Sequence, residues 1–315
     1  MSALPGRWLE LALARPHPSH AHLYGEGLRL VGARGMRVEA GRLLAVFPSP
    51  DNPSEVVEAA VAAIRSFAGS APEVLGWAWR SLDEQRAIWR APMRVWRISE
   101  GIEVVPAGTG DMPRTGRDVA PVADAIRGSG VTIRIRPGPA FGAADHPTTR
   151  GCLRLLERTL RPGERVADLG AGSGILSIAS VLLGASGVRA FEADPLACAA
   201  AAENFLENRV RDQVELLHER VSPGTPGRLG SPSGVLANLE TGLVLSLLPH
   251  LRDTMPEEGW LIVSGIPGGE RAAVRERVDA LGLGVQADDE EEGWWSAVLR
   301  PRPRPTVSFS PRAER

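Results

Sequence analysis

Hydrophobic and polar positions show two different periodicities in the first part of the chain. Residues 7–14 (RWLELALA) alternate as in a strand, whereas residues 53–69 repeat apolar positions every three or four residues behind a proline in the first turn. Between them, residues 20–33 have the pattern of a helix and residues 35–48 that of a hairpin. Together these elements predict a small α+β unit over residues 1–70.

From about residue 98 onward, strand-like runs alternate with helix-like runs. The predicted strands are residues 131–136, 165–170, 187–194, 213–219, 234–239, 259–266 and 295–301. The predicted helices are residues 148–160, 174–185, 195–209, 242–255 and 268–282. Alternation of this kind is typical of an α/β fold, in which helices cover both faces of a mostly parallel sheet. With the last strand inserted antiparallel, the count predicts a seven-stranded sheet in a domain over residues 98–300.

Two segments outside these units have unusual compositions. Residues 71–97 contain four tryptophans among arginines and are predicted to be a linker. The aromatic side chains could pack a linker helix against a neighbouring domain, or they could form a face that docks a peptide. Residues 301–315 are rich in proline and arginine and predict a disordered or extended tail.

Composition narrows the classes of function. The 315 residues are 43% hydrophobic, and the net charge is −2 because 36 basic residues, all of them arginine, nearly balance 38 acidic ones. This balance predicts no general binding of nucleic acid or anionic lipid. No apolar run approaches the ~20 residues of a membrane span. Cys152 and Cys198 have neither the number nor the spacing of a disulfide framework or a metal site. We therefore expect a cytoplasmic protein without a metal, and a monomer by default.

Three glycines follow a predicted strand and open a predicted helix. Gly170, Gly172 and Gly174, in the run VADLGAGSGI, permit a tight turn, and the helix start offers free N–H groups to a polar ligand. A dinucleotide fingerprint needs a small residue where this chain has Ile175, so the turn favours a nucleoside joined to an amino acid over a pyrophosphate. We assign these glycines and Asp168 of the same run to a cofactor site.

Glu192 ends the next predicted strand, 22 positions after Gly170. An acid in this place can accept hydrogen bonds from both hydroxyls of a ribose. Taken alone, Glu192 would be interpreted as an ordinary surface carboxylate. Combined with the glycine run, it implies S-adenosylmethionine as the cofactor.

Asn238 ends a further strand and is predicted to lie at the carboxyl edge of the sheet, where ligands of such folds bind. Its amide carbonyl can orient an attacking amine, and it carries no charge that would stabilise the unreactive ammonium. A turn or capping role is the alternative. Glu240 is a weaker candidate for the same pocket.

Five segments of this domain have an order and spacing that match a known family. They are residues 136–157, 166–185, 191–210, 234–239 and 259–266. They resemble the PrmA family, the methyltransferases of the large-subunit ribosomal stalk-base protein, number eleven. The resemblance implies a Rossmann-like, seven-stranded class I methyltransferase domain, joined by a linker to a small ferredoxin-like recognition domain. It also implies methyl transfer from S-adenosylmethionine to lysine or N-terminal amines of a ribosomal large-subunit protein.

The resemblance also implies roles for single residues. By position, the residues that match the family's binding residues are Thr149, Gly170, Glu192 and Asn238. The proline-rich loop over residues 136–150 would be a lid, with Phe141 packing over the cofactor. His146 would help to close the lid or be structural. The hydroxyls of Thr148 and Thr149 would bind the cofactor's carboxylate or cap the following helix.

The lid departs from the family's pattern at three positions. Arg136 replaces an aspartate, and Ala143 and Ala144 replace a threonine and a glycine. Glu192 stands for the usual aspartate but can play the same role. We expect cofactor binding to survive these changes, whereas the substrate is less fixed because specificity depends on the lid and the N-terminal unit.

These observations predict a protein N-methyltransferase whose catalytic residues are Asn238, Phe141 and His146. One alternative is an acceptor other than the ribosomal protein, either another protein lysine or a small-molecule amine. The other is a binding module without catalytic activity. A last segment, residues 288–295 (DDEEEGWW), predicts a solvated acidic turn with partly buried Trp294 and Trp295.

Overall fold

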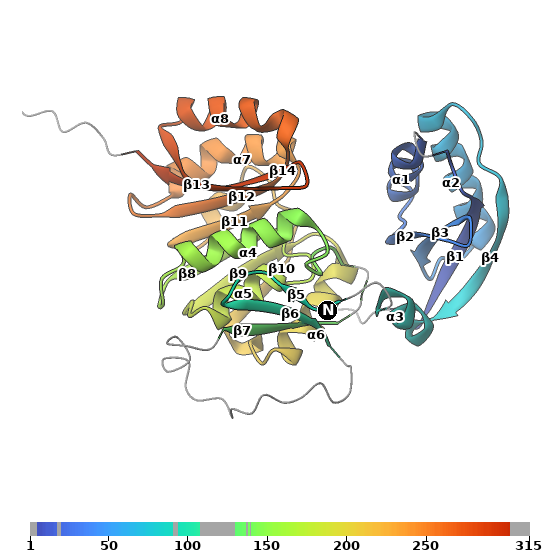
Figure 1. Ribbon diagram of the computed structural model, residues 1–315, viewed down its shortest axis with the longest axis horizontal. Helices are drawn as coiled ribbons and strands as arrows, with labels where there is room; N and C mark the ends of the chain where they lie inside the picture. The colour runs from blue at the N-terminus through green and yellow to red at the C-terminus, as the bar shows by residue number, and fades with distance from the viewer. Residues whose placement is uncertain are drawn as a thin grey trace, which may run out of the picture.

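The protein has two folded domains (Figure 1). The structure is a computed structural model that describes residues 5–17, 20–90, 94–107, 130–136, 138 and 140–302. Almost all of the tail predicted over residues 301–315 lies outside these described residues. Within the described part of the chain, no helix combines the length and apolarity that crossing a membrane requires.

The N-terminal domain is a four-stranded antiparallel sheet with helices on one face. In spatial order the strands are β2 (Gly35–Glu39), β3 (Arg42–Pro48), β1 (Arg7–Ala14) and β4 (Val74–Ser81), and the helices are α1 (Ala21–Leu30) and α2 (Pro53–Ala68). The chain order β1–α1–β2–β3–α2–β4 and this strand order are those of a ferredoxin-like fold, as the family resemblance implied. Because β4 completes the sheet, the domain extends past residue 70 and the predicted linker begins too early.

Local chemistry explains where α2 begins and ends. The Asn52 side chain accepts a hydrogen bond from the Ser54 N–H at the N-cap, and Pro53 occupies the first turn. Gly69 ends the helix with a φ of 77°, in the left-handed region that glycine tolerates best. The apolar face of α2, including Ile64, packs with Leu9 and Leu11 of the sheet.

A connecting segment lies between the two domains in the chain. It consists of α3 (Leu82–Arg90) and a three-stranded sheet of β5 (Trp96–Arg97), β6 (Ile102–Pro106) and β7 (Val131–Ile135). Apolar residues of this sheet, including Ile102 and Ile133, pack in the core of the C-terminal domain. The run at residues 131–136, predicted as part of the large sheet, therefore belongs to this small sheet. Its pattern was that of a strand, but the sequence could not specify its neighbour.

The C-terminal domain contains a seven-stranded sheet. In spatial order its strands are β10 (Val214–His218), β9 (Gly187–Glu192), β8 (Arg165–Leu169), β11 (Gly234–Asn238), β12 (Trp260–Pro267), β14 (Trp294–Pro301) and β13 (Leu283–Glu291). The first five strands are parallel, and β14 inserts antiparallel between β12 and β13. The predicted sheet size and the antiparallel last strand are confirmed, although β13 takes the place of residues 131–136 in the predicted set of strands.

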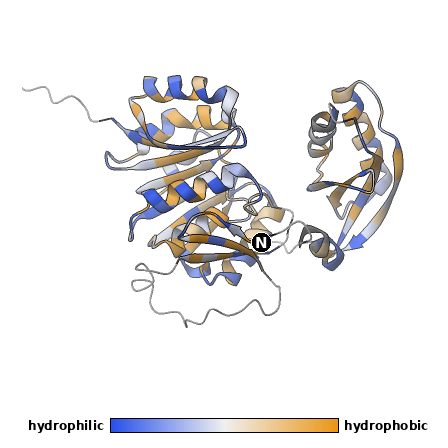
Figure 2. Cartoon of the chain, viewed as in Figure 1, coloured by the Kyte–Doolittle hydropathy of each residue, from blue (hydrophilic) through white to orange (hydrophobic). Residues whose placement is uncertain are grey.

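Helices cover both faces of this sheet. They are α4 (Pro147–Thr159), α5 (Ile175–Leu182), α6 (Pro195–Glu207), α7 (Thr241–Thr254) and α8 (Arg271–Ala280), with short 3-10 turns at Arg211–Gln213, Thr225–Arg228 and Gly268–Glu270. Alternate residues of β11 enter different apolar layers: Leu236 packs with α4 and α5, and Val235 packs with α7 and α8. Hydrophobic and hydrophilic residues accordingly interleave along the covering helices (Figure 2).

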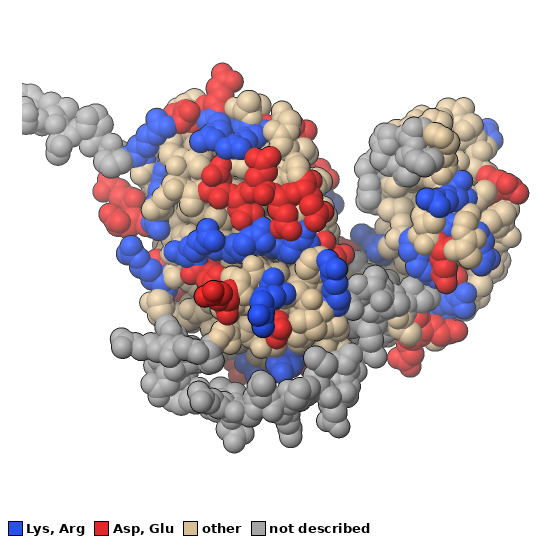
Figure 3. All heavy atoms as spheres, viewed as in Figure 1, with Lys and Arg blue, Asp and Glu red and all other residues tan. Residues whose placement is uncertain are grey.

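The acidic run at residues 288–292 is not a solvated turn. Most of it belongs to β13, and its carboxylates lie between arginines of α4 and α8 (Figure 3). Arg154 donates to Asp289 at 2.6 and 2.8 Å, and Arg271 donates to Asp288 at 2.8 Å. The expected partial burial holds for Trp294, whereas Trp295 is fully buried.

Candidate active site

The glycine turn connects β8 to α5 at the carboxyl edge of the sheet. Gly172 and Gly174 have φ values of 56° and 79°, in the left-handed region. A Cβ on Gly172 would lie 2.7 Å from the Phe141 carbonyl oxygen, and one on Gly174 would lie 2.4 Å from the Phe205 ring. A side chain at either position would clash with these neighbours, so the turn requires glycine at both.

Glu192, the last residue of β9, is held against this turn. One carboxylate oxygen accepts the Gly172 N–H at 2.9 Å, and the other accepts the Asp194 N–H at 2.8 Å. Each oxygen keeps a further lone pair. The carboxylate is thus fixed in place and still able to accept two hydroxyls of a ligand.

Asp168 occupies a different environment from Glu192. Its side chain is buried and accepts a hydrogen bond from the Ser177 hydroxyl at 2.6 Å. Burial raises the pKa of the Asp168 carboxyl to about 6. The structure therefore places Asp168 beneath the glycine turn, where it supports α5. Its assignment to the cofactor site stays a prediction.

The lid loop is docked on the glycine turn through its backbone. The Phe141 carbonyl accepts the Ser173 N–H at 2.8 Å, and the Gly142 carbonyl accepts the Ser173 hydroxyl at 2.6 Å. The Phe141 ring itself is 55% exposed. Phe141 thus reaches the turn with its carbonyl group, while its ring remains largely open to solvent.

His146 is the N-cap of α4. Its Nδ1 accepts the Thr148 N–H at 3.3 Å and lies 2.8 Å from the Thr148 hydroxyl. Because Nδ1 accepts, the neutral ring carries its proton on Nε2. Burial lowers the pKa of His146, an effect that the nearby Arg150 reinforces and that Asp145 and Glu292 oppose. Capping this helix was the alternative role predicted for Thr148 and Thr149, but His146 provides the cap.

Two buried hydroxyls have no partner among the described residues. The Thr149 hydroxyl lies in the first turn of α4, and the Thr241 hydroxyl lies at the first residue of α7. Unpartnered buried hydroxyls are costly and call for a ligand or a water molecule. Thr149 was expected from the sequence. Thr241 was missed, although its place at a helix start three residues after Asn238 was a usable signal.

Asn238 lies where the sequence predicted it. It ends β11, is half-buried and is in register with Ser264 of β12. Its side-chain amide makes no hydrogen bond to any described residue. The amide is therefore available to a ligand at the same sheet edge as Glu192.

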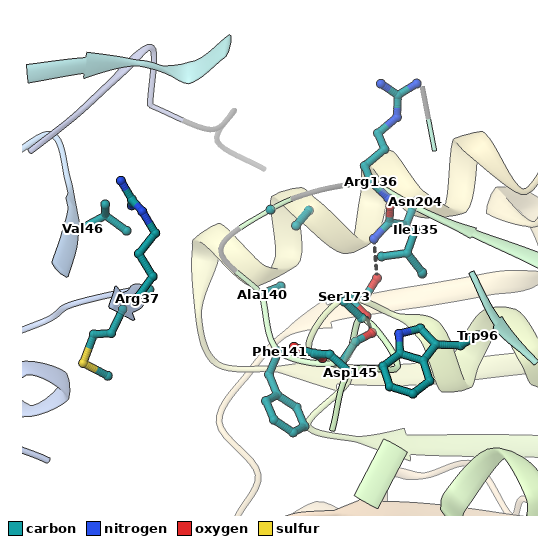
Figure 4. Close-up of a pocket in the computed structure, with 16 residues that line it drawn as sticks. Arg37, Val46, Trp96, Ile135, Arg136, Ala140, Phe141, Asp145, Ser173 and Asn204 are labelled. Atoms are coloured by element: carbon teal, nitrogen blue, oxygen red, sulfur yellow. Dashed lines mark hydrogen bonds between the residues drawn. The ribbon is translucent and has the colours of Figure 1, made fainter. Parts of the chain in front are cut away.

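A cavity of about 220 Å³ separates the lid from the N-terminal domain (Figure 4). Met36 and Arg37 of β2 line one side, and Phe141 and Asp145 of the lid line the other. Arg136 points away from the cavity in Figure 4, and its guanidinium donates to Glu207 of α6 at 2.5 Å. The charge reversal at position 136 is thus neutralised on α6.

Comparison with known proteins identifies the family. The family model for ribosomal protein L11 methyltransferase (PrmA) matches residues 115–302. The ribosomal protein L11 methyltransferase of Symbiobacterium thermophilum is 34% identical over 242 residues, which are 76% of this chain and 73% of the relative. The chain belongs to the PrmA family. A second relative, from Chloroflexus aurantiacus, is 34% identical over 237 residues, with 69% of this chain and 68% of the relative covered.

A solved PrmA-family structure agrees with this assignment. The crystal structure of ribosomal protein L11 methylase from Lactobacillus delbrueckii subsp. bulgaricus is 26% identical, with a TM-score of 0.56. It matches over 67% of this chain and its own entire length. The predicted family, the Rossmann-like fold and the activity of a methyltransferase that acts on protein are confirmed.

One departure from the PrmA lid has a structural consequence. Ala144, where the family pattern has glycine, is buried and has a φ of 65°. A left-handed alanine costs ~1 kcal/mol relative to its ordinary conformations. The lid keeps the glycine-like backbone shape without the glycine.

Proposed function

We propose that this protein transfers methyl groups from S-adenosylmethionine to amines of ribosomal protein L11. The observation that carries the proposal is the Glu192 carboxylate, fixed by the Gly172 and Asp194 N–H groups beside the glycine turn. Membership in the PrmA family supports the acceptor.

The residues present fit this cofactor. Glu192 would accept the two ribose hydroxyls, because each of its carboxylate oxygens keeps a lone pair beside the glycine turn. The buried, unpartnered Thr149 hydroxyl would donate to the carboxylate of the methionine part. The free amide of Asn238 would complete the site at the sheet edge.

When bound, S-adenosylmethionine supplies an electrophilic methyl group on a sulfonium. The chain's task is to present a neutral amine in line with that group and to exclude water. The Asn238 carbonyl can accept an amine N–H without stabilising the ammonium, because the amide has no charge. The bound cofactor would give its methyl group to the amine nitrogen and leave as a neutral thioether, so the product would be a methylated ammonium.

His146 is poorly placed to remove the amine proton. Its Nδ1 already accepts hydrogen bonds from Thr148, and its Nε2 carries the proton in the neutral ring. We assign His146 to capping α4 and to the wall of the site, and we expect the proton to leave through solvent before the amine enters.

The test uses unmethylated ribosomal protein L11 from cells that lack this modification. The purified chain and S-adenosylmethionine should add one or more methyl groups to L11, detected by intact-mass spectrometry. Because this chain contains no lysine, the enzyme cannot methylate lysine side chains of its own. Transfer to other ribosomal proteins but not to L11 would refute the proposed acceptor, and no cofactor binding at all would refute the proposed site.

A further inference from the structure

Trp294 lies on the same sheet edge as Asn238. Asn238 is in register with Ser264 of β12, and farther along that strand Pro267 is in register with Trp294, the first residue of β14. Trp294 of β14 therefore lies at the carboxyl end of β12. On its other side, β12 pairs with β11, the strand that carries Asn238. Trp294 is half-buried.

Three aromatic rings connect this edge to the lid. The Trp294 and His146 ring centroids are 4.9 Å apart in an edge-to-face arrangement, and those of His146 and Phe141 are 5.2 Å apart. These are favourable distances for aromatic pairs. We call Phe141, His146 and Trp294 the aromatic row.

One buried guanidinium holds the backbone beside His146 and the turn before Trp294. Arg150 is 4% exposed, and its Nη1 donates to the carbonyls of Ala144 and Asp145 at 3.1 and 2.8 Å, directly before His146. Its Nε donates to Glu291 at 2.8 Å and its Nη2 to Glu292 at 2.9 Å, just before Trp294.

Trp96 of β5 completes the surroundings of Arg150. The Arg150 guanidinium lies 4.5 Å from the centre of the Trp96 ring. The lid, the hairpin of β13 and β14, and the connecting segment therefore meet at one side chain. A lysine at this position would present a single ammonium and could not reach the lid carbonyls and both carboxylates together.

We propose that the aromatic row forms the acceptor side of the active site, with Trp294 contacting the methylated amine and Arg150 acting as a positioning residue. This inference rests on the proposed function. Each methyl transfer leaves a cationic methylammonium, and such cations are attracted to the faces of aromatic rings. A neutral His146 within the row adds no repelling charge.

The test compares Trp294→Ala with Trp294→Phe and with the control Leu206→Ala, which removes an exposed apolar side chain of α6. An attraction of about 0.5–2 kcal/mol between the ring and the charge that develops on the amine nitrogen predicts that Trp294→Ala lowers kcat/KM for L11 by roughly 2–30-fold. It should also shift the products toward fewer methyl groups, while Trp294→Phe restores both and Leu206→Ala changes neither.

Arg150→Lys should reproduce the kcat/KM and product shifts of Trp294→Ala, because the row loses its spacing. Calorimetry with S-adenosylmethionine should give all variants a Kd within about threefold of the parent chain, and thermal unfolding confirms that each is folded. An unchanged kcat/KM and product distribution in Trp294→Ala would overturn the inference. So would an Arg150→Lys effect confined to cofactor Kd. Failure of the proposed function is a separate result, since the parent chain itself would then not methylate L11.

Discussion

At the scale of single residues, His146 makes the site sensitive to pH. Its ring caps α4 only when Nδ1 is unprotonated, and burial lowers its pKa below the ordinary 6.5. A histidine whose folded pKa is depressed stabilises the fold above its unfolded pKa, and this stabilisation is lost as the pH falls through the lower folded value. We therefore expect α4 and the lid to weaken below about pH 6.5.

His146→Asn tests this expectation, because asparagine caps helices well and does not titrate in this range. At pH 7.5 the variant and the parent should have free energies of unfolding within ~1 kcal/mol of each other. At pH 5 the variant should be the more stable of the two. Thermal unfolding at each pH measures the difference in stability between the variant and the parent. This difference would be the same at both pH values if His146 did not titrate in the folded protein. The neighbouring charged groups Asp145, Arg150 and Glu292 are present in both proteins, so their own titration affects both.

Ala144 makes a second prediction at this scale. Ala144→Gly relieves the left-handed strain but increases the freedom of the unfolded chain, so the two effects oppose each other. We expect the free energy of unfolding to change by less than ~1 kcal/mol. Ala40→Gly is the matched control, since Ala40 has a φ of 47° in the exposed turn between β2 and β3. A loss above ~2 kcal/mol in Ala144→Gly alone would show that its methyl group is essential to lid packing.

At the scale of elements, the ion pairs between α4 and β13 hold the acidic hairpin in the sheet. Arg154→Gln removes the paired contacts to Asp289 and the 2.6 Å contact to Glu291. Because these groups are partly buried, we expect a loss of ~2 kcal/mol, seen as a drop of about 4–8 °C in Tm. Arg228→Gln, which breaks an exposed pair with Glu219, should shift Tm by no more than about 2 °C. Equal shifts would contradict the importance of burial.

Sequence patterns are sufficient to predict some of the helices and strands but not others. The helices at α2 and α4–α8 and the strands β8–β12 could be predicted, because each pairs a clear apolar period with a start or stop signal. β13 could not, since five consecutive acids indicate a solvent-exposed segment until the arginines of α4 and α8 neutralise them. β7 had the right local pattern, but its sheet partner depends on residues far away in the chain. β4 was missed, because residues 71–97 were predicted to be a linker.

At the scale of the whole molecule, residues of both domains line one cavity next to the lid. The glycine turn, Glu192 and Asn238 could be predicted because local rules for parallel sheets place strand ends at one edge. Contacts between distant segments could not, including Arg150 with Glu292 and Arg34 of the N-terminal domain with Asp194 at 3.0 Å. The second pair ties the small domain to the residue whose N–H binds Glu192.

The most direct measurement of the central claim is calorimetric titration with S-adenosylmethionine of the parent chain, Glu192→Gln and the control Glu215→Gln. The substitution at position 192 keeps the size of the side chain but removes its charge, and it presents an NH₂ group to one backbone N–H. A charged hydrogen bond contributes about 1.5–3 kcal/mol, so Glu192→Gln should weaken the Kd by roughly 10–150-fold, while Glu215→Gln leaves it unchanged. Equal affinity in all three proteins would contradict the account.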